Sequence, residues 1–564
     1  MTETIGQRRL WLESTGVFAG ALAILLTLGA SAPFTKELGV CESGAVRDVL
    51  AGNIILPHFI PGPMVHVPPL YWWTTAIMVH LFGWTEIAFR LPALAPAAAT
   101  CAIVYGWATN RLGREAGFWG AASLLFCHFF IDAARQPRMD SMLAMFVTGA
   151  IVALEDALAS RRRSSWIGAT LLIGAGCLTK GILGIALPGG SVALYLLLRK
   201  RFFEVFWLDL IATFTIGLAI GLSWYVAGYE IAGHKFLEWQ VGMNLWTRFI
   251  PASAGGANYC VHPFWYFVPQ ILVGLLPWSL YFPVVLVLLW RGNQIRLPES
   301  IVYAGASFVA MFLFFSLSRG KCQVYILPAF PPLAMLIGWA VSAVCGEESA
   351  PPWATRLFSA ASIVTAIGAT AMALGSIALI HYGLPSNLPF ALHSTDQRLI
   401  DIFLSLASTR HYGVLNWIVL SILGSLVVLR GTWRFPAMQV VGVLIIALVG
   451  TRFWFRVMNP ALAEHETLKR FAQEVMDVVP ANASIAHLGI EDCGLYFYSP
   501  RPIEPISRFS CNAQPPPPPY LLIRKQRFDA LPADQRACLT TMLISEPVDG
   551  QGPRLLLQLT PPNQ

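Results

Sequence analysis

The sequence predicts a polytopic α-helical membrane protein. Only 12% of its 564 residues are charged and 56% are hydrophobic, and the mean hydropathy is +0.60. Soluble proteins carry about 25% charged residues, so this chain has about half the expected share. Apolar runs of roughly 18 residues or more, the length that crosses a bilayer, recur along the first 450 positions. This composition excludes a soluble globular protein.

About thirteen apolar segments are predicted to span the membrane. The first follows Arg8 and Arg9 and ends in Ala30-Ser31-Ala32, which resembles a signal-peptide cleavage site. Because Pro33 discourages cleavage there, we expect this segment to be retained as a span. The predicted spans are 15–34, 88–109, 115–132, 139–158, 165–181, 182–198, 206–228, 267–290, 300–317, 324–344, 355–381, 412–429 and 435–452.

The short loops predict the orientation of these spans. With the N-terminus in the cytoplasm, the basic residues fall in the inside segments, as the positive-inside rule requires. The net charge of +7 therefore reflects topology and gives no reason to expect nucleic acid as a partner. The basic inside segments are Arg8/Arg9, Arg111/Arg114, Arg161–Arg163, Arg199–Arg201, Arg291/Arg296 and Arg430/Arg434.

Two parts of the chain differ in character. Residues 1–452 are predicted to form the membrane domain, with large external loops at 35–87, 229–266 and 382–411. Residues 453–564 begin with apolar residues at helical spacing and continue with short apolar segments between turns. This pattern predicts a small soluble α/β domain on the periplasmic side. Cysteines in that domain lie in a compartment that permits disulfides.

Polar residues gather at span ends on the predicted external face. Ionisable groups at the hydrocarbon boundary are costly and suggest a functional site. Each also has a simpler interpretation: Lys180 as a snorkelling anchor, Asp140 as a helix cap, Glu42 as an ordinary loop carboxylate, and His262 as part of an aromatic belt. Their joint occurrence favours a site. The set comprises Glu42, Asp48, His66, Arg138, Asp140, Lys180, Asn244, Arg248, His262, Arg319, Lys321 and Tyr325.

These residue types suit a lipid-linked phosphate. Lys and Arg neutralise phosphate, aromatic rings accommodate lipid, and a carboxylate can act as general base on an incoming hydroxyl. The stretch HVPPLYWW in loop 35–87 adds a proline pair that favours an extended entry. The aromatic segment after it can lie along the membrane interface. We therefore predict an enzyme that acts on a lipid-linked substrate.

The order of motifs resembles the GT-C glycosyltransferases that use polyprenyl-phosphate sugars. The motifs are an acidic residue in the first external loop, PPLYWW, FRLPAL, an Arg-x-Asp turn, LTKG, HPFWYF…GLLPW and FFSLSRGK…YILP. The pattern is most similar to the lipid A aminoarabinose transferases of glycosyltransferase family 83, and more distantly to the protein O-mannosyltransferases. The resemblance extends from about residue 35 to 335. It implies an inverting transfer from an undecaprenyl-phosphate sugar to a lipid A-like or other envelope acceptor, on the periplasmic face of the bacterial inner membrane.

The resemblance also implies roles for individual residues. Glu42 and Asp140 match catalytic carboxylates. A histidine that can bind a divalent metal in relatives is matched by His262, and His66 replaces a carboxylate that relatives can use beside it. A His66/His262 pair could hold Zn²⁺ through imidazole nitrogens, and Mg²⁺ or Mn²⁺ are the other candidates. The expected donor-binding residues are Arg138, Lys180, Arg248, Arg319, Lys321 and Tyr325.

Two positions depart from the family pattern. The Asp-Glu pair is Cys41-Glu42, so the favoured base is missing, and Glu-Lys-Pro-Pro is His66-Val67-Pro68-Pro69, which removes a phosphate-binding lysine. Either Glu42 or Asp140 has taken the role of base, or this branch uses a different donor or acceptor.

Two other functions stay open from the sequence. One is transfer to a protein hydroxyl. The other is a flippase or transporter of a lipid-linked sugar, a class that places its binding residues near the bilayer midplane, often in broken helices with repeat symmetry. The chain shows no comparable halves, and its ionisable residues sit at span ends. A glycosyltransferase is therefore the favoured hypothesis.

Overall fold

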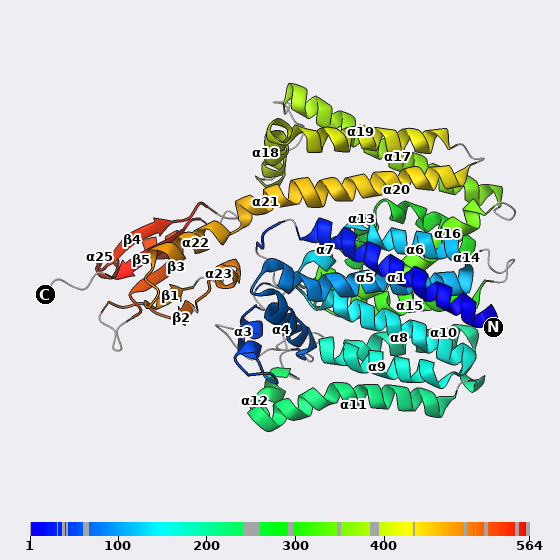
Figure 1. Cartoon of the computed structure of the whole chain (residues 1–564), viewed down its shortest axis with the longest axis horizontal. Coiled ribbons are helices and arrows are strands. Elements are labelled where there is room, and N and C mark those ends of the chain that lie inside the picture. Colours follow the sequence, from blue (N-terminus) through cyan, green and yellow to red (C-terminus); the bar gives the residue numbers. More distant parts are fainter. Residues whose placement is uncertain are drawn as a thin grey trace.

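The computed structural model shows a bundle of long helices with a small sheet domain beyond one end (Figure 1). The end of the bundle nearer that domain, which holds Glu86, Asp140 and Lys180, is called the domain face. The opposite end, which holds Arg111, Arg163 and Glu299, is called the N-terminal face. The structure describes residues 2–559 except for 31, 36–39, 41–42, 60–66, 205, 241–259, 291–296, 347–350, 384–393, 432–434, 490–492, 502, 512–516 and 548–551.

All thirteen predicted spans fall on helices. Within the described residues, nine helices are long and apolar enough to cross a membrane, and the number is eleven if two bent pairs each form one span. The other two are α9 (Arg163–Lys180) and α10 (Leu183–Arg199). The nine long spans are α1 (Thr2–Gly29), α5 (Glu86–Leu112), α8 (Asp140–Ser160), α11 (Trp207–Ala232), α15 (Glu299–Leu317), η7 (Gln323–Ala329) with α16 (Phe330–Cys345), α17 (Pro352–Tyr382), α19 (His411–Arg430), and α20 (Pro436–Phe453) with η8 (Trp454–Met458) and α21 (Asn459–Glu466).

Two predicted spans are bent. Helices α6 (Arg114–Leu125) and α7 (His128–Arg135) meet at 60°, while α13 (Phe267–Gly274) meets the segment of η5 (Trp278–Tyr281) and α14 (Phe282–Trp290) at 106°. Pro277 stands at the second break, where it cannot donate a backbone hydrogen bond to the preceding turn. The break leaves α13 in contact with α7 and η7.

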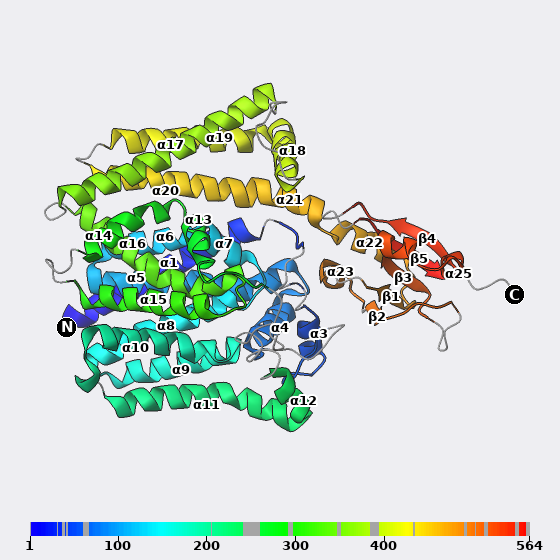
Figure 2. The ribbon, with the colours of Figure 1, turned by 180° about the vertical axis from the view of Figure 1, so that it is seen from behind.

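Close helix packing forms the centre of the bundle. Helix α16 packs on α6, α6 on α5, and α5 on α8. A Cβ atom added at Gly338 of α16 would lie 2.3 Å from the carbonyl oxygen of Ala116 and 2.6 Å from the amide of Gly120. Small residues allow such approach between membrane helices. Helices α17, α19 and α20 pack on one another as a separate layer of the bundle (Figure 2).

Short helices cover the domain face. They include α4, which begins at the PPLYWW motif and buries Tyr71 and Trp72. These buried rings pack in a cluster with Phe34 and Phe89, so part of this aromatic motif is core. The described helices are α3 (Ser43–Leu50), α4 (Leu70–Phe82), α12 (His234–Leu237) and α18 (Ser394–Thr409), and η1 (Phe202–Glu204) lies between α10 and α11.

The C-terminal domain is an α/β fold, as predicted. Its five-stranded sheet has the order β2-β1-β3-β5-β4. Strand β1 pairs in parallel with β2 and β3, and β5 pairs antiparallel with β3 and β4. A disulfide joins Cys511 and Cys538. The elements are α22 (Lys469–Val478), β1 (Ile485–Leu488), α23 (Cys493–Tyr498), β2 (Ile503–Ile506), β3 (Tyr520–Arg524), α24 (Lys525–Asp529), α25 (Ala533–Ala537), β4 (Leu539–Ile544) and β5 (Arg554–Leu559).

Candidate active site

Asp140 is a buried carboxylate held by two cations. It is the first residue of α8, and its Oδ2 lies 3.2 Å from Nε of Arg138. Its Oδ1 accepts a hydrogen bond from Nζ of Lys180, the last residue of α9. Only 4% of the Asp140 side chain and 9% of the Lys180 side chain are exposed. The helix-cap interpretation of Asp140 and the snorkelling interpretation of Lys180 are therefore not supported.

The two helix ends favour this pairing. Helices α8 and α9 pack side by side, and the N-terminus of one meets the C-terminus of the other at the domain face. A helix dipole stabilises an anion in the first turn and a cation in the last turn. Asp140 and Lys180 occupy these two positions. The local structure of both helices thus supports the ion pair.

Tyr325 joins the same group from a third segment. Nζ of Lys180 lies 4.6 Å from the centroid of the Tyr325 ring, within cation–π distance. Tyr325 is in η7, which packs against α8. The Arg-x-Asp, LTKG and YILP motifs, far apart in sequence, therefore meet at one place.

Lys321 occupies the turn just before η7. It is only 3% exposed. Its Nζ donates to the carbonyl oxygen of His262 at 3.0 Å and to that of Ser318. Both acceptors are neutral, so these bonds leave the positive charge of Lys321 available for an anion. Burial, with the neighbouring Arg319, lowers the pKa of Lys321. Arg319 itself is exposed.

The proposed metal ligands are not brought together by the described residues. The His262 side chain is exposed, and its ring stacks on Tyr266 with 4.0 Å between ring centroids. His66 lies outside the described residues, as do Glu42 and Arg248. The described part of the chain contains no group of three or more His, Cys, Asp or Glu side chains placed to hold a metal ion. The divalent metal stays a prediction, and no step proposed below uses it.

A contact between the C-terminal domain and the membrane domain was missed by sequence reasoning. Nζ of Lys469 lies 2.8 Å from Glu86 at the start of α5, and the Tyr498 hydroxyl donates to the same carboxylate at 2.9 Å. That hydroxyl also accepts from the backbone N–H of Phe34 at 2.8 Å. We call this cluster of Phe34, Glu86, Lys469 and Tyr498 the domain contact.

The domain contact continues along α3, the helix that begins directly after Glu42. The Arg47 guanidinium of α3 donates to carbonyl oxygens of Tyr496, Ser499 and Pro500. The C-terminal domain therefore packs against the predicted first external loop. No motif in the tail signalled this arrangement.

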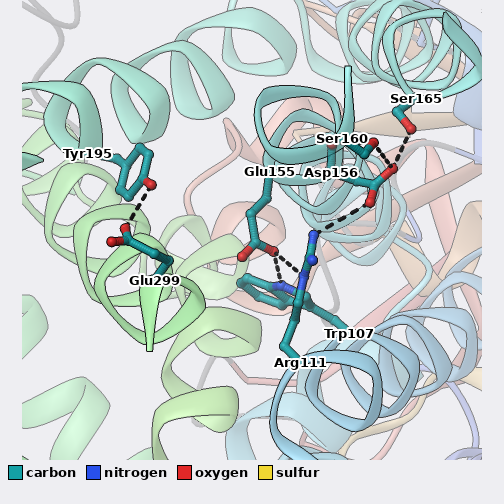
Figure 3. Close-up of polar contacts among 8 residues, drawn as sticks. All are labelled: Trp107, Arg111, Glu155, Asp156, Ser160, Ser165, Tyr195 and Glu299. Atoms are coloured by element: carbon teal, nitrogen blue, oxygen red, sulfur yellow. Dashed lines mark hydrogen bonds and ion pairs between the residues drawn. The ribbon is translucent and has the colours of Figure 1, made fainter. Parts of the chain in front are cut away.

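A second set of polar contacts lies at the N-terminal face, and Figure 3 shows its residues. Arg111 lies 3.5 Å from both Glu155 and Asp156, and the Trp107 indole donates to Glu155 at 2.5 Å. The Tyr195 hydroxyl donates to Glu299 at 2.9 Å. A cavity of about 260 Å³ is bordered by Arg111, Glu155, Tyr195 and Glu299. Arg111 and Trp107 thus link α5 to α8, and the Tyr195–Glu299 bond links α10 to α15.

Comparisons with known proteins agree with this fold. The family model described as dolichyl-phosphate-mannose-protein mannosyltransferase matches residues 66–225. ArnT from Cupriavidus metallidurans, solved bound to undecaprenyl phosphate, superposes with a TM-score of 0.73 and 20% identity over 96% of this chain and 97% of that one.

Curated relatives point in the same direction. The undecaprenyl phosphate-alpha-4-amino-4-deoxy-L-arabinose arabinosyl transferase 2 of Proteus mirabilis is 30% identical over 296 residues, which cover 51% of this chain and 52% of the relative. The corresponding transferase of Edwardsiella ictaluri is 28% identical over 420 residues, which cover 73% of this chain and 71% of the relative. The chain is a relative of these transferases and has the GT-C fold. The match to the Proteus relative spans about half of that protein's length.

The resemblance drawn from the motifs is thereby confirmed at the level of family likeness and fold. The family model includes Arg138, Asp140 and Lys180 within its matched residues, whereas Lys321 and Tyr325 lie beyond them. The roles of individual site residues stay predictions.

Proposed function

We propose that the chain is an inverting glycosyltransferase of the inner membrane. In this proposal it transfers a sugar from undecaprenyl phosphate to a lipid A-like envelope acceptor on the periplasmic face. One observation carries the proposal: Asp140, Lys180 and Tyr325 meet at the domain face, with Lys321 on the adjoining turn. The names of the curated relatives support the donor.

We assign different roles to the two carboxylates. Both oxygens of Asp140 already face a cation, so we assign it the role of positioning Arg138 and Lys180. The role of general base then falls to Glu42. This carboxylate removes the proton of the acceptor hydroxyl as the oxygen attacks the anomeric carbon.

Lys321 stabilises the leaving group in the proposed reaction. The bond between the anomeric carbon and the phosphate oxygen breaks as the acceptor bond forms, and negative charge develops on the departing lipid phosphate. A fixed cation in a site shielded from water is worth more there than in bulk solvent. Buried Lys321 is such a cation. A single displacement from the face opposite the phosphate inverts the anomeric configuration.

Mass spectrometry of the cell envelope tests this function. Envelope lipids and glycans are compared between cells with the gene, cells without it, and cells carrying Asp140→Asn. We expect one lipid class to lose a sugar mass in the second and third strains. A redistribution of lipid-linked sugar across the membrane, with no lost product, would instead identify a flippase.

A protein acceptor is the second candidate. The match to the protein mannosyltransferase model over residues 66–225 favours it. The same experiment separates the two acceptors, because loss of the sugar from proteins with unchanged lipids would support transfer to a protein hydroxyl.

A further inference from the structure

Two cysteines from distant segments meet beside Lys321. The Sγ atoms of Cys260 and Cys322 lie 2.7 Å apart, although 62 positions separate them in sequence. Cys260 lies near the end of the predicted external loop 229–266, and Cys322 directly follows Lys321. A disulfide bond has an S–S length of about 2.05 Å, so only a small movement separates the two sulfur atoms from a bond.

The backbone around the two cysteines is already in register. The N–H of Lys321 donates to the carbonyl oxygen of Cys260 at 2.7 Å, and Val261 forms an antiparallel bridge with Gly320. These bonds hold the two segments face to face at the level of the cysteines. The pairing of the thiols therefore follows from the backbone and does not depend on one flexible side chain.

The pair is open to oxidation. Both side chains are partly exposed, whereas Cys101, Cys127 and Cys177 are buried in or beside the spans. The C-terminal domain lies beyond the same end of the bundle and already contains the Cys511–Cys538 disulfide. The two pairs thus share a compartment in which a disulfide forms.

We propose that Cys260 and Cys322 form a disulfide bond that fastens the external loop to the Lys321 turn. The oxidant is the disulfide of a thiol oxidoreductase or of a small disulfide. One thiolate attacks that disulfide and forms a mixed disulfide, and the second thiolate then displaces the oxidant's remaining sulfur. The two cysteines lose two protons and two electrons, and the oxidant is reduced to two thiols.

The bond has a structural consequence for the candidate site. Lys321 hydrogen-bonds to the carbonyl groups of Cys260 and His262 through its N–H and its ammonium group. A disulfide at Cys322, the residue after Lys321, would keep those carbonyl groups beside Lys321. The Lys321 ammonium group would then stay in place, because it is hydrogen-bonded to one of them. The disulfide also closes a long loop in the unfolded chain, and such links stabilise the folded state.

Peptide mapping tests the bond directly and does not depend on any enzymatic activity. Membranes are denatured in excess N-ethylmaleimide without reductant, and the digested wild-type protein is analysed before and after reduction. We expect a cross-linked peptide that contains Cys260 and Cys322 and disappears on reduction, with the Cys511–Cys538 peptide as internal control. If both cysteines carry N-ethylmaleimide, or if either is joined to another cysteine, the proposal is wrong.

Thermal unfolding gives a second measurement. In a Cys511→Ser/Cys538→Ser background, we expect reductant to lower the Tm. The effect should vanish when Cys260→Ser and Cys322→Ser are added, and should persist when Cys345→Ser is added as a matched control. A Tm that reductant does not change in the first background would contradict the proposal. The proposed transferase can fail its own test while this bond stands, because neither readout uses a sugar donor.

Discussion

At the scale of the residue, the Asp140–Lys180 pair is held on all sides by its neighbours. Both side chains are almost completely buried, and Arg138 and the Tyr325 ring complete their surroundings. Removing one partner of a buried pair leaves a charge without compensation, which costs about 3–5 kcal/mol. Loss of either partner alone is therefore expected to destabilise the bundle as well as to disturb the proposed site.

The first prediction concerns the coupling between these two residues. Asp140→Asn and Lys180→Met each lower stability, but the double variant is expected to lose less than the sum of the two single losses, by about 1–3 kcal/mol. Unfolding of the purified protein in detergent measures this with a double-mutant cycle. If the two single losses of stability simply add in the double variant, the Asp140–Lys180 contact contributes nothing to the free energy of unfolding.

The second prediction concerns Lys321 and depends on the proposed function. Lys321→Met is expected to lower kcat by about 100- to 1,000-fold, with a smaller change in KM for the donor, because the charge acts on the departing phosphate. Gln323→Ala, two residues further along, is the control and is expected to have little effect, since Gln323 is exposed and carries no charge. Equal effects of Lys321→Met on kcat/KM and on donor binding would contradict this role.

At the scale of the element, the domain contact fixes α22 and α23 against the start of α5. Tyr498 takes part in two hydrogen bonds there, one to Glu86 and one from Phe34. Burial, together with Glu86, raises the pKa of the Tyr498 hydroxyl, so it stays a hydrogen-bond donor at neutral pH. The domain contact is therefore a set of polar interactions that holds the C-terminal domain against the membrane domain.

The third prediction follows from the domain contact. Tyr498→Phe is expected to weaken docking of the C-terminal domain by about 1–3 kcal/mol, because Glu86 and the Phe34 amide lose a partner. Faster limited proteolysis between α21 and α22 measures the loss. Arg470→Ala is the matched control, since Arg470 is highly exposed and pairs with Glu474 of its own helix, and it should leave the rate unchanged. Equal proteolysis rates for the two variants would refute the prediction.

The fourth prediction concerns the crossing of α6 and α16. Gly338→Ala is expected to cost about 1–3 kcal/mol, because its methyl group meets backbone atoms of Ala116 and Gly120. Gly305→Ala on α15 has nothing within 4 Å of the added atom and serves as the control. The unfolding midpoint in detergent is expected to fall for Gly338→Ala and to stay close to that of the wild type for Gly305→Ala. Similar midpoints for the two variants would mean that α6 and α16 can move apart at little cost.

At the scale of the whole molecule, the two ends of the bundle have different chemistry. The N-terminal face carries Arg111, Arg161 and Arg201 around its cavity. The domain face carries the candidate site and the sheet domain. The positive-inside rule predicts that the N-terminal face lies in the cytoplasm.

The fifth prediction tests this orientation. Protease added to spheroplasts is expected to cleave the C-terminal domain, whereas the loop between α8 and α9, which contains Arg161 and Arg162, is cut only after the membrane is broken. Epitope tags at the two positions, read by immunoblot, give the measurement. Cleavage of the α8–α9 loop in intact spheroplasts would reverse the topology.

The spans were predicted well from the sequence, because a helix needs about 20 apolar residues to cross the bilayer whichever helices it packs against. The ion pair of Asp140 with Lys180 was not predicted, since it joins residues 40 positions apart through the packing of α8 on α9. The domain contact was not predicted either, because docking depends on the complementary shapes of two parts that carry no shared pattern. Lys321 and Tyr325 were identified as candidates from the motif resemblance. The structure adds that Lys321 hydrogen-bonds to the His262 carbonyl oxygen and that Tyr325 lies against Lys180.

The domain contact also bears on how the protein is made. Tyr498 and Glu86 lie 412 positions apart, so ribosomes that add about 5–20 residues per second need tens of seconds between them. Throughout that interval Glu86 has been synthesised and its tyrosine partner has not. A nascent or truncated chain that stops before α22 therefore keeps an incomplete domain face, and that face can be completed only after the last part of the polypeptide has been made.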